Sequence, residues 1–268
     1  MKRTILLTLA LTMALAVTGC GSNGNTSSQS SSGSGSDTAS QSQSSASGSQ
    51  TAGEVMSYEE YMAADLDSQV TIETYVQAKQ SWWEDKATLY TQDQDGAYFV
   101  YDAACSQELY DQLTPGTKIQ VTGYKSEWSG EVEIMDGTVS LVEGGDTFVA
   151  EPLDVTALLA DESLIDHQNQ LVSFQGLTVE PSQDASGNEA AFLYNWDGSG
   201  TQGDDLYFNV SVDGQTYTFT VESYLCDSST EVYKAVEALE IGQVIDAEGF
   251  LYWYEGVNPH ITSITAAQ

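Results

Sequence analysis

A nine-residue pattern occurs twice in the chain, and this repeat restricts the possible folds more than any other feature. Residues 116–124 (GTKIQVTGY) return as residues 242–250 (GQVIDAEGF), with glycine at the first and eighth positions and an aromatic residue at the ninth. The apolar residues between the glycines alternate with polar ones, which is typical of a strand with one buried face. A short helix-like segment precedes each copy, and a turn bearing Trp or Tyr follows it. We therefore expect one small β architecture to occur twice.

The segments around the first copy predict a five-stranded barrel. Asp95-Gly96 is a strong hairpin signal between the second and third strands. Three strands, a helix and two more strands are the order of elements in an OB-fold, while an SH3-like barrel or a small sandwich is the alternative. The expected helices cover residues 58–65 and 106–113, and the expected strands cover residues 70–76, 87–92, 97–101, 116–124 and 131–142.

The second copy predicts the same order of elements with longer loops. Asp154 is expected to cap a helix, and Ser228 to Glu231 to open another that reaches about Leu239. The fold class is therefore mainly β: two tandem five-stranded OB-fold-like barrels over residues 54–145 and 150–268, each with a short helix between strands 3 and 4. The expected strands of the second barrel are 170–179, an interrupted strand at 192–196 and 206–212, 216–225, 242–250 and 260–265.

The first 53 residues have a different composition. Lys2 and Arg3 precede an apolar run over residues 5–17, which has the length of a signal h-region and is too short to span a bilayer. Val17-Thr18-Gly19-Cys20 follows and resembles the lipobox of bacterial lipoproteins, in which the cysteine is lipidated. We expect residues 1–19 to be a lipoprotein signal peptide, Cys20 to carry the lipid, and residues 20–53 to be a disordered Ser/Gly/Gln-rich tether. An ordinary secretory signal with a chance cysteine is the alternative.

The lipobox-like motif, the tether and the repeated strand together resemble secreted Gram-positive-type lipoproteins with tandem OB-fold-like domains. The resemblance brings no assigned ligand. It implies that the chain is anchored by its lipidated N-terminus on the extracytoplasmic face of the bacterial cell membrane.

The charge balance is strongly acidic, with 7 Lys and Arg against 40 Asp and Glu. Removal of the signal peptide would leave five lysines and no arginine. Nucleic-acid binding draws most of its affinity from Lys and Arg that neutralise phosphates. We therefore expect nucleic acid to be an unlikely partner. A nucleic-acid-binding OB protein and a structural lipoprotein of an envelope complex remain the alternatives.

The sequence contains no recognisable catalytic motif. Two histidines are present, His167 and His260, and Gly-x-Ser-x-Gly, Walker, His-Glu-x-x-His and Cys-x-x-Cys motifs are absent. We expect no enzymatic activity, no catalytic residues and no cofactor. Calcium is a possibility at two oxygen-rich loops, residues 91–102 and 195–205, for which solvated acidic turns are the alternative.

Cys105 and Cys226 each follow the third strand of a predicted barrel and precede its helix. Equivalent positions in two separate barrels are not expected to face each other. We expect two free, buried thiols, with a disulfide or a reactive thiol as the alternatives.

Tryptophan and tyrosine residues gather in the loops that border the binding face of an OB-fold. These loops connect strands 1 to 2 and 4 to 5, where OB-folds bind oligonucleotides and oligosaccharides. Aromatic rings there can stack on sugars or bases, and packing at the barrel end is the alternative. We predict a non-catalytic binding or adaptor protein whose ligand is an uncharged glycan, a peptide or a partner protein. The predicted ligand-binding residues are Trp82, Trp83, Trp128, Trp196, Tyr252 and Trp253.

Overall fold

The computed structural model describes residues 54–267, so the predicted signal peptide, Cys20 and the tether lie outside the described range. The described residues all belong to one compact unit. Among the described residues, no helix combines the length and the apolar character needed to cross a membrane.

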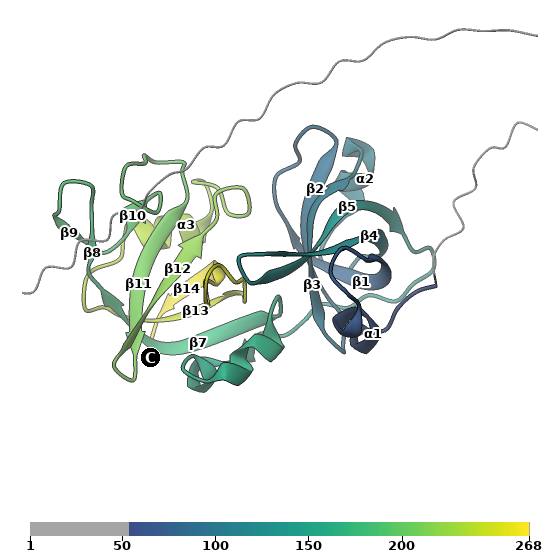
Figure 1. The fold of residues 1–268 in the computed structure, drawn as a ribbon. Helices are drawn as coiled ribbons and strands as arrows, with labels where there is room; N and C mark the ends of the chain where they lie inside the picture. Colours follow the sequence, from purple (N-terminus) through teal and green to yellow (C-terminus); the bar gives the residue numbers. More distant parts are fainter. Residues whose placement is uncertain (1–53, 268) are drawn as a thin grey trace, which may run out of the picture. The chain divides into compact units, whose positions relative to one another are not determined.

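The first barrel closes in the strand order β1-β2-β3-β5-β4, drawn in blue and dark teal in Figure 1. β4 pairs antiparallel with β1 and β5, and β3 pairs parallel with β5. The alternating inward side chains make its core, which includes Val70, Ile72, Leu89, Val100, Ile119 and Ile134. The elements are α1 (Tyr58–Ala63), β1 (Gln69–Lys79), β2 (Lys86–Gln92), β3 (Ala97–Ala104), α2 (Gln107–Gln112), β4 (Lys118–Trp128) and β5 (Glu131–Leu141).

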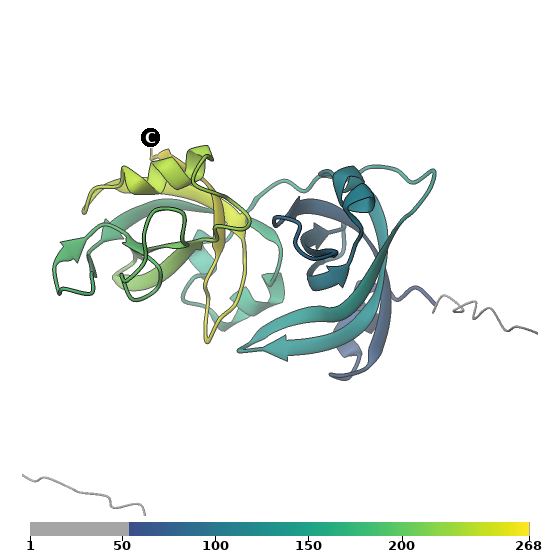
Figure 2. The same cartoon turned by 90° about the horizontal axis from the view of Figure 1, so that it is seen from above.

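The second barrel repeats this order with β7-β11-β12-β14-β13, and the pairing of β11 with β7 closes it. Its helix α3 (Glu231–Glu237) follows the third strand and lies along β14 (Figure 2). The strands are β7 (Leu171–Glu180), β11 (Leu206–Val212), β12 (Gln215–Val221), β13 (Val244–Phe250) and β14 (His260–Ala266). The predicted fold class, two five-stranded barrels with a helix between strands 3 and 4, is confirmed.

Four short strands lie outside the closed barrels. β6 and β10 extend the sheet of the second barrel at its edges, and β8 and β9 pair with each other in the insertion after β7. Their bounds are β6 (Leu153–Asp154), β8 (Ser182–Gln183), β9 (Glu189–Ala190) and β10 (Leu193–Tyr194).

Three expected elements differ in the structure. Residues 192–196, expected as the first part of an interrupted strand with 206–212, contain the separate strand β10, which pairs antiparallel with β11. The expected helix after Asp154 is a pair of 3₁₀ turns, η1 (Thr156–Leu158) and η2 (Glu162–His167). The Asp154 carboxylate accepts a hydrogen bond from the backbone N–H of Thr156 at 3.0 Å. Asp161, five residues after Thr156, then caps the second turn. The strand expected to reach residue 225 ends at Val221, because Asp205 accepts the N–H and hydroxyl of Ser223 and turns the chain.

The repeated glycines serve the same purpose in both barrels. Gly116 and Gly242 have φ angles of +87° and +84°, which favour glycine because it has no Cβ. Gly123 and Gly249 lie where the pairing between strands 4 and 5 is irregular. A Cβ at Gly123 would lie 2.7 Å from the Met135 carbonyl oxygen, and one at Gly249 would meet the His260 carbonyl. The pattern therefore marks the entry to strand 4 and its closest approach to strand 5.

A third hydrophobic cluster joins the two barrels. Tyr90 and Phe99, on the outer face of β2 and β3, are buried against Phe250 of the second barrel. The rings of Tyr90 and Phe250 stack with centroids 4.5 Å apart. The Leu171 N–H donates to the Gln92 side-chain oxygen at 2.8 Å. One side of the first barrel is therefore covered by the second rather than by solvent.

Candidate ligand-binding groove

A groove of about 1480 Å³ is lined by residues of both barrels, and we call it the aromatic groove. The first barrel contributes residues from the loop before β2, from β2 and β3, from the end of β4 and from β5. The second barrel contributes the equivalent strands β11 and β12, the first residue of β14, and the loops before β11 and after β13. OB-folds bind ligands on this face and with these loops. The binding faces of the two barrels therefore open into the same groove.

The exposed aromatic side chains are concentrated in this groove. Seven Trp or Tyr side chains among the described residues are exposed, and six of them line it. Trp83, Trp128 and Trp196 are the most open tryptophans, with 68%, 61% and 72% of their surface exposed. The other three are Tyr101, Tyr224 and Tyr254. Scattered apolar side chains on a surface need no explanation, but a set confined to one groove indicates a contact surface.

Tight turns hold two of these tryptophans in place. Trp83 and Lys86 form a β-bridge around Glu84 and Asp85, which both have positive φ. Trp128 pairs with Glu131 around a second turn whose two central residues, Ser129 and Gly130, also have positive φ. Positive φ at both central residues is the signature of a type I′ hairpin turn. Each tryptophan is therefore the last residue before a two-residue turn.

The structure brings four of the six predicted site residues to the groove, namely Trp83, Trp128, Trp196 and Tyr252. Trp82 does not line it. Its indole N–H donates to the Cys105 carbonyl at 2.9 Å, because adjacent residues of an extended chain point to opposite sides.

Trp253 also lies outside the groove. It packs against the core of the second barrel, and its indole lies so close to Gly130 that a Cβ there would be 2.8 Å from the ring. Its backbone N–H donates to Glu131 at 2.9 Å. Trp253 therefore fills the joint between the barrels.

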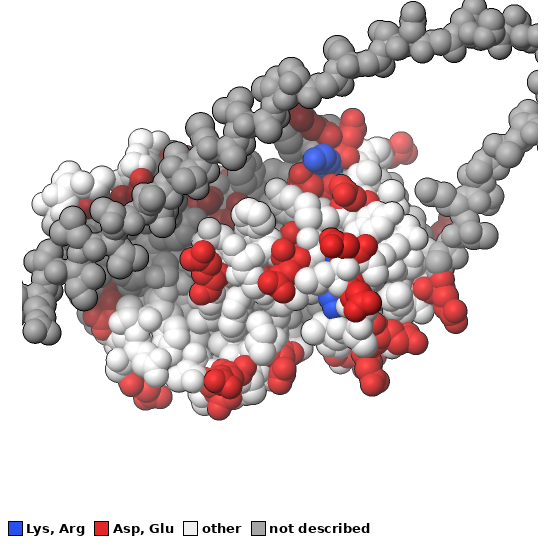
Figure 3. Space-filling model, in the orientation of Figure 1, with Lys and Arg blue, Asp and Glu red and all other residues white. Residues whose placement is uncertain are grey.

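The charged side chains of the groove are almost all acidic. One lysine lines it, Lys86, and its ammonium lies 3.0 Å from the Asp102 carboxylate. Figure 3 shows carboxylates spread over the visible face, with lysine at few places. The groove carboxylates are Asp102, Glu127, Glu133, Asp205, Glu222 and Glu255. A ligand that enters the groove therefore meets aromatic faces and carboxylate oxygens.

Burial changes the ionisation of two of these carboxylates. It raises the pKa of Glu133 to about 7. Burial, with Asp205 adding to it, raises the pKa of Glu222 to about 7. Near neutral pH both groups are partly protonated, so the groove carries less negative charge than its composition indicates.

Sequence reasoning missed several groove residues. Tyr101 follows Phe99 by two positions on β3, so the two share a face, and Glu133 of β5 is paired in register with Phe99. The alternation predicts that this face points out of the barrel. The alternation does not indicate that a second barrel covers part of this face.

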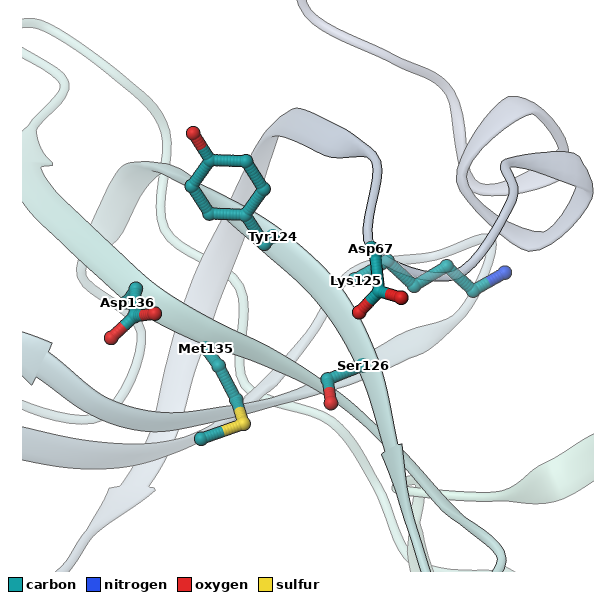
Figure 4. Close-up of a pocket in the computed structure, with 6 residues that line it drawn as sticks. All are labelled: Asp67, Tyr124, Lys125, Ser126, Met135 and Asp136. Atoms are coloured by element: carbon teal, nitrogen blue, oxygen red, sulfur yellow. The ribbon is translucent and has the colours of Figure 1, made fainter. Parts of the chain in front are cut away.

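A smaller pocket of about 310 Å³ lies on the first barrel beside β4 and β5. Figure 4 shows the Lys125 side chain running away from Tyr124 and Asp136. Its ammonium donates to the carbonyls of Tyr61, Met62 and Ala64 at 2.9–3.0 Å, at the end of α1. Lys125 therefore caps a helix and leaves this pocket without a free cation.

The described residues offer no cluster for a metal ion. Among residues 54–267, no group of three or more His, Cys, Asp and Glu could hold one. In the first oxygen-rich loop, one Asp93 oxygen accepts the N–H groups of Asp95 and Gly96 at 2.8 and 2.9 Å, which uses this carboxylate within the turn.

Cys105 and Cys226 are free and buried, as expected. Burial raises the pKa of both thiols, that of Cys226 to about 11. The neutral thiol is a poor nucleophile, so neither residue has the environment of a reactive cysteine.

Comparison with known proteins gives similarity of structure alone. No protein family and no curated protein matches the sequence. A murine DNA binding protein bound to double-stranded DNA is 10% identical, with a TM-score of 0.36 over 74% of this chain and 96% of that one. The p204 HINb domain is 12% identical, with a TM-score of 0.35 over 76% and 100%. A deletion variant of the single-stranded DNA binding protein from Thermus aquaticus is 15% identical, with a TM-score of 0.24 over 75% and 94%.

These neighbours correct one expectation from the sequence. We expected nucleic acid to be an unlikely partner because the chain is acidic. Two of the neighbours are DNA-binding proteins by description, which contradicts that exclusion. At these similarities the neighbours assign no ligand to this chain.

Proposed function

We propose that the chain is a non-catalytic binding or adaptor protein that holds an extended ligand in the aromatic groove. The observation that carries this proposal is the confinement of six of the seven exposed aromatic side chains to that groove. Stacking on such rings contributes about 1–3 kcal/mol per base in nucleic-acid examples. A glycan, a peptide or a segment of a partner protein can supply flat groups for Trp83, Trp128 and Trp196.

The volume of the groove supports a ligand longer than one small molecule. Small-molecule sites usually measure about 300–1,000 Å³, and the aromatic groove measures about 1480 Å³. The tryptophans also come from loops of both barrels, so a ligand that contacts all three must bridge them.

The test is a binding screen with the purified protein against immobilised glycans, peptides and single-stranded DNA. The triple variant Trp83→Ala, Trp128→Ala and Trp196→Ala should lose at least tenfold in affinity for whichever ligand binds. Tyr124→Ala is the control, because Tyr124 is exposed and lies outside the groove. Equal binding by the triple variant and the wild type would overturn the proposal.

Single-stranded nucleic acid is the second candidate. The strands and loops that line the groove are those that OB-folds use for oligonucleotides, and aromatic faces accept any base.

Salt dependence separates the ligand classes. Affinity for nucleic acid should rise with added salt, because repulsion from the groove carboxylates is screened and few lysines contact phosphate. An uncharged glycan should show little dependence, and a cationic ligand should bind less tightly as salt is added.

We further propose that the protein acts at the extracytoplasmic face of a bacterial membrane, anchored through Cys20. The support is Val17-Thr18-Gly19-Cys20 after an apolar run. Metabolic labelling with a radioactive fatty acid in a bacterial host should label the wild type and not Cys20→Ala. Equal labelling of both proteins would contradict the anchor.

A further inference from the structure

Glu133 is a largely buried residue whose carboxylate has no hydrogen-bond partner among the described residues. It lies on β5, paired in register with Phe99 of β3 and Ser126 of β4, and it lines the aromatic groove. Only 5% of its surface is exposed. Its oxygens accept no hydrogen bond from any residue in the range 54–267. Its oxygens are not among the enclosed side-chain atoms that lack a partner, so they remain accessible from the groove, where a ligand can donate hydrogen bonds to them.

Neighbouring carboxylates have partners of their own. Glu131, two residues earlier on the same face, accepts the Trp253 N–H and the Gln168 side chain at 2.9 and 3.2 Å. Asp102 pairs with Lys86, and Asp205 accepts from Ser223. Glu131 faces the joint between the barrels, whereas Glu133 lines the groove and has no such partner.

Aromatic rings lie around this carboxylate. The pKa of Tyr101 is raised by burial, with Asp102 and Glu133 adding to it. The pKa of Tyr252 is also raised, first by burial and then by Glu131 and Glu133. The negative charge of Glu133 therefore acts on the phenols of Tyr101 and Tyr252, and both rings line the groove.

A carboxylate among aromatic rings favours a guanidinium or ammonium group. Such a cation is attracted to the ring faces and forms charge-assisted hydrogen bonds with the carboxylate. Arginine suits both contacts because its planar group stacks on rings and binds a carboxylate through two N–H groups. Lys86 does not compete for Glu133, because its ammonium is held by Asp102.

We propose that the aromatic groove binds a cationic peptide segment and seats one of its arginine side chains against Glu133. This inference rests on the proposed function, because it names the ligand class of the same groove. The six groove carboxylates against one paired lysine supply charge complementarity for such a segment.

Calorimetry with the purified full chain tests the inference. The probes are a blocked hexapeptide of alternating arginine and glycine, and the same peptide with citrulline, which keeps the shape of arginine and removes its charge. The arginine peptide should bind at least tenfold more tightly. Glu133→Gln should remove most of this difference and leave citrulline-peptide binding unchanged.

Glu127→Gln is the matched control, because Glu127 lines the groove and is exposed. It makes the same substitution as Glu133→Gln at another groove position and should lower affinity for the arginine peptide less than threefold. Binding at pH 7 should also release protons, measured as heat that varies with the buffer, because the cation favours the ionised form of Glu133. Glu133→Gln should release fewer protons than the wild type.

Equal affinity for the two peptides, or equal effects of the two glutamine variants, would overturn the inference. If neither peptide binds while a glycan or single-stranded DNA binds in a tryptophan-dependent way, the inference is wrong and the proposed function stands. Peptide binding that survives the triple tryptophan variant would overturn the proposed function instead.

Discussion

The hydroxyl of Tyr90 lies 2.6 Å from Nδ1 of His260, and this buried contact joins strands 170 residues apart in the sequence. The Gln80 amide donates to the same hydroxyl at 3.3 Å, so the phenol bonds to groups on both sides. The ring of Tyr252, which lines the groove, stacks on His260 with centroids 4.1 Å apart. The joint between the barrels thus positions a groove residue.

Removing this hydroxyl should weaken the fold. Tyr90→Phe leaves the buried Nδ1 of His260 without its hydrogen-bond partner, which should lower the free energy of unfolding by about 1–3 kcal/mol. Urea denaturation measures the loss. Tyr124→Phe is the control, because Tyr124 is exposed and should change the value by less than about 0.5 kcal/mol. Similar losses in both variants would show that the contact does not matter.

Acid should destabilise the protein through His260. Burial lowers the pKa of His260 from 6.5 to about 3. Between these values the unfolded chain binds more protons, so this contribution is fully present above pH 6.5 and is lost as pH falls toward 3. The loss is about 1.4 kcal/mol per pH unit. Urea denaturation at pH 7 and pH 5 should show a smaller loss for His260→Gln than for the wild type, and parallel profiles would contradict this.

Ionisation of Glu131 should make the protein less stable as pH rises, which is opposite to the pH dependence contributed by His260. Burial raises the pKa of Glu131 well above the usual range, and one of its oxygens is buried without a partner. Its contribution to stability is therefore present below pH 4.5 and lost as pH rises toward its folded-state pKa. Glu131→Gln keeps an acceptor and cannot ionise, so it should match the wild type near pH 4 and be more stable at pH 8.

Denaturant midpoints at the two pH values measure the effect of Glu131→Gln. Glu127→Gln, at an exposed position, should shift the midpoint equally at both pH values. A Glu131→Gln variant that is less stable than the wild type at pH 8 would contradict the prediction.

The close approach at Gly123 should make it intolerant of a side chain. Gly123→Ala places a Cβ 2.7 Å from the Met135 carbonyl oxygen, and the forced backbone shift should cost about 1–3 kcal/mol of unfolding free energy. Gly137→Ala is the matched control on the paired strand, where the nearest atom is 3.4 Å away. That change should be neutral or stabilising by up to about 1 kcal/mol. Thermal melts of both variants provide the comparison.

The barrels could be predicted because their signals are local. Alternation marks the strands, and the Ser57 and Glu60 side chains cap α1 reciprocally as their spacing indicates. The length of β12 could not be predicted in this way. It ends early because Asp205, eighteen residues before Ser223, supplies the hydrogen bonds that turn the chain.

The candidate site was predictable in part. Loop positions indicated that Trp83, Trp128 and Trp196 border a binding face, and all three line the groove. The same argument also selected Trp82 and Trp253, which do not line the groove. The Trp82 side chain points to the Cys105 carbonyl, and the Trp253 ring packs against Gly130. Partners so distant in sequence leave no local pattern.

The sequence alone determined the repeated barrel, because strand period, turn glycines and helix caps act within a few residues. Only the tertiary structure decided that the two binding faces open into one groove. The reason lies in the joint between the barrels, where Tyr90, Phe99 and Phe250 bury one another across the two folds. That packing also left Glu131 paired in the joint and Glu133 unpaired in the groove, although the two carboxylates are only two residues apart.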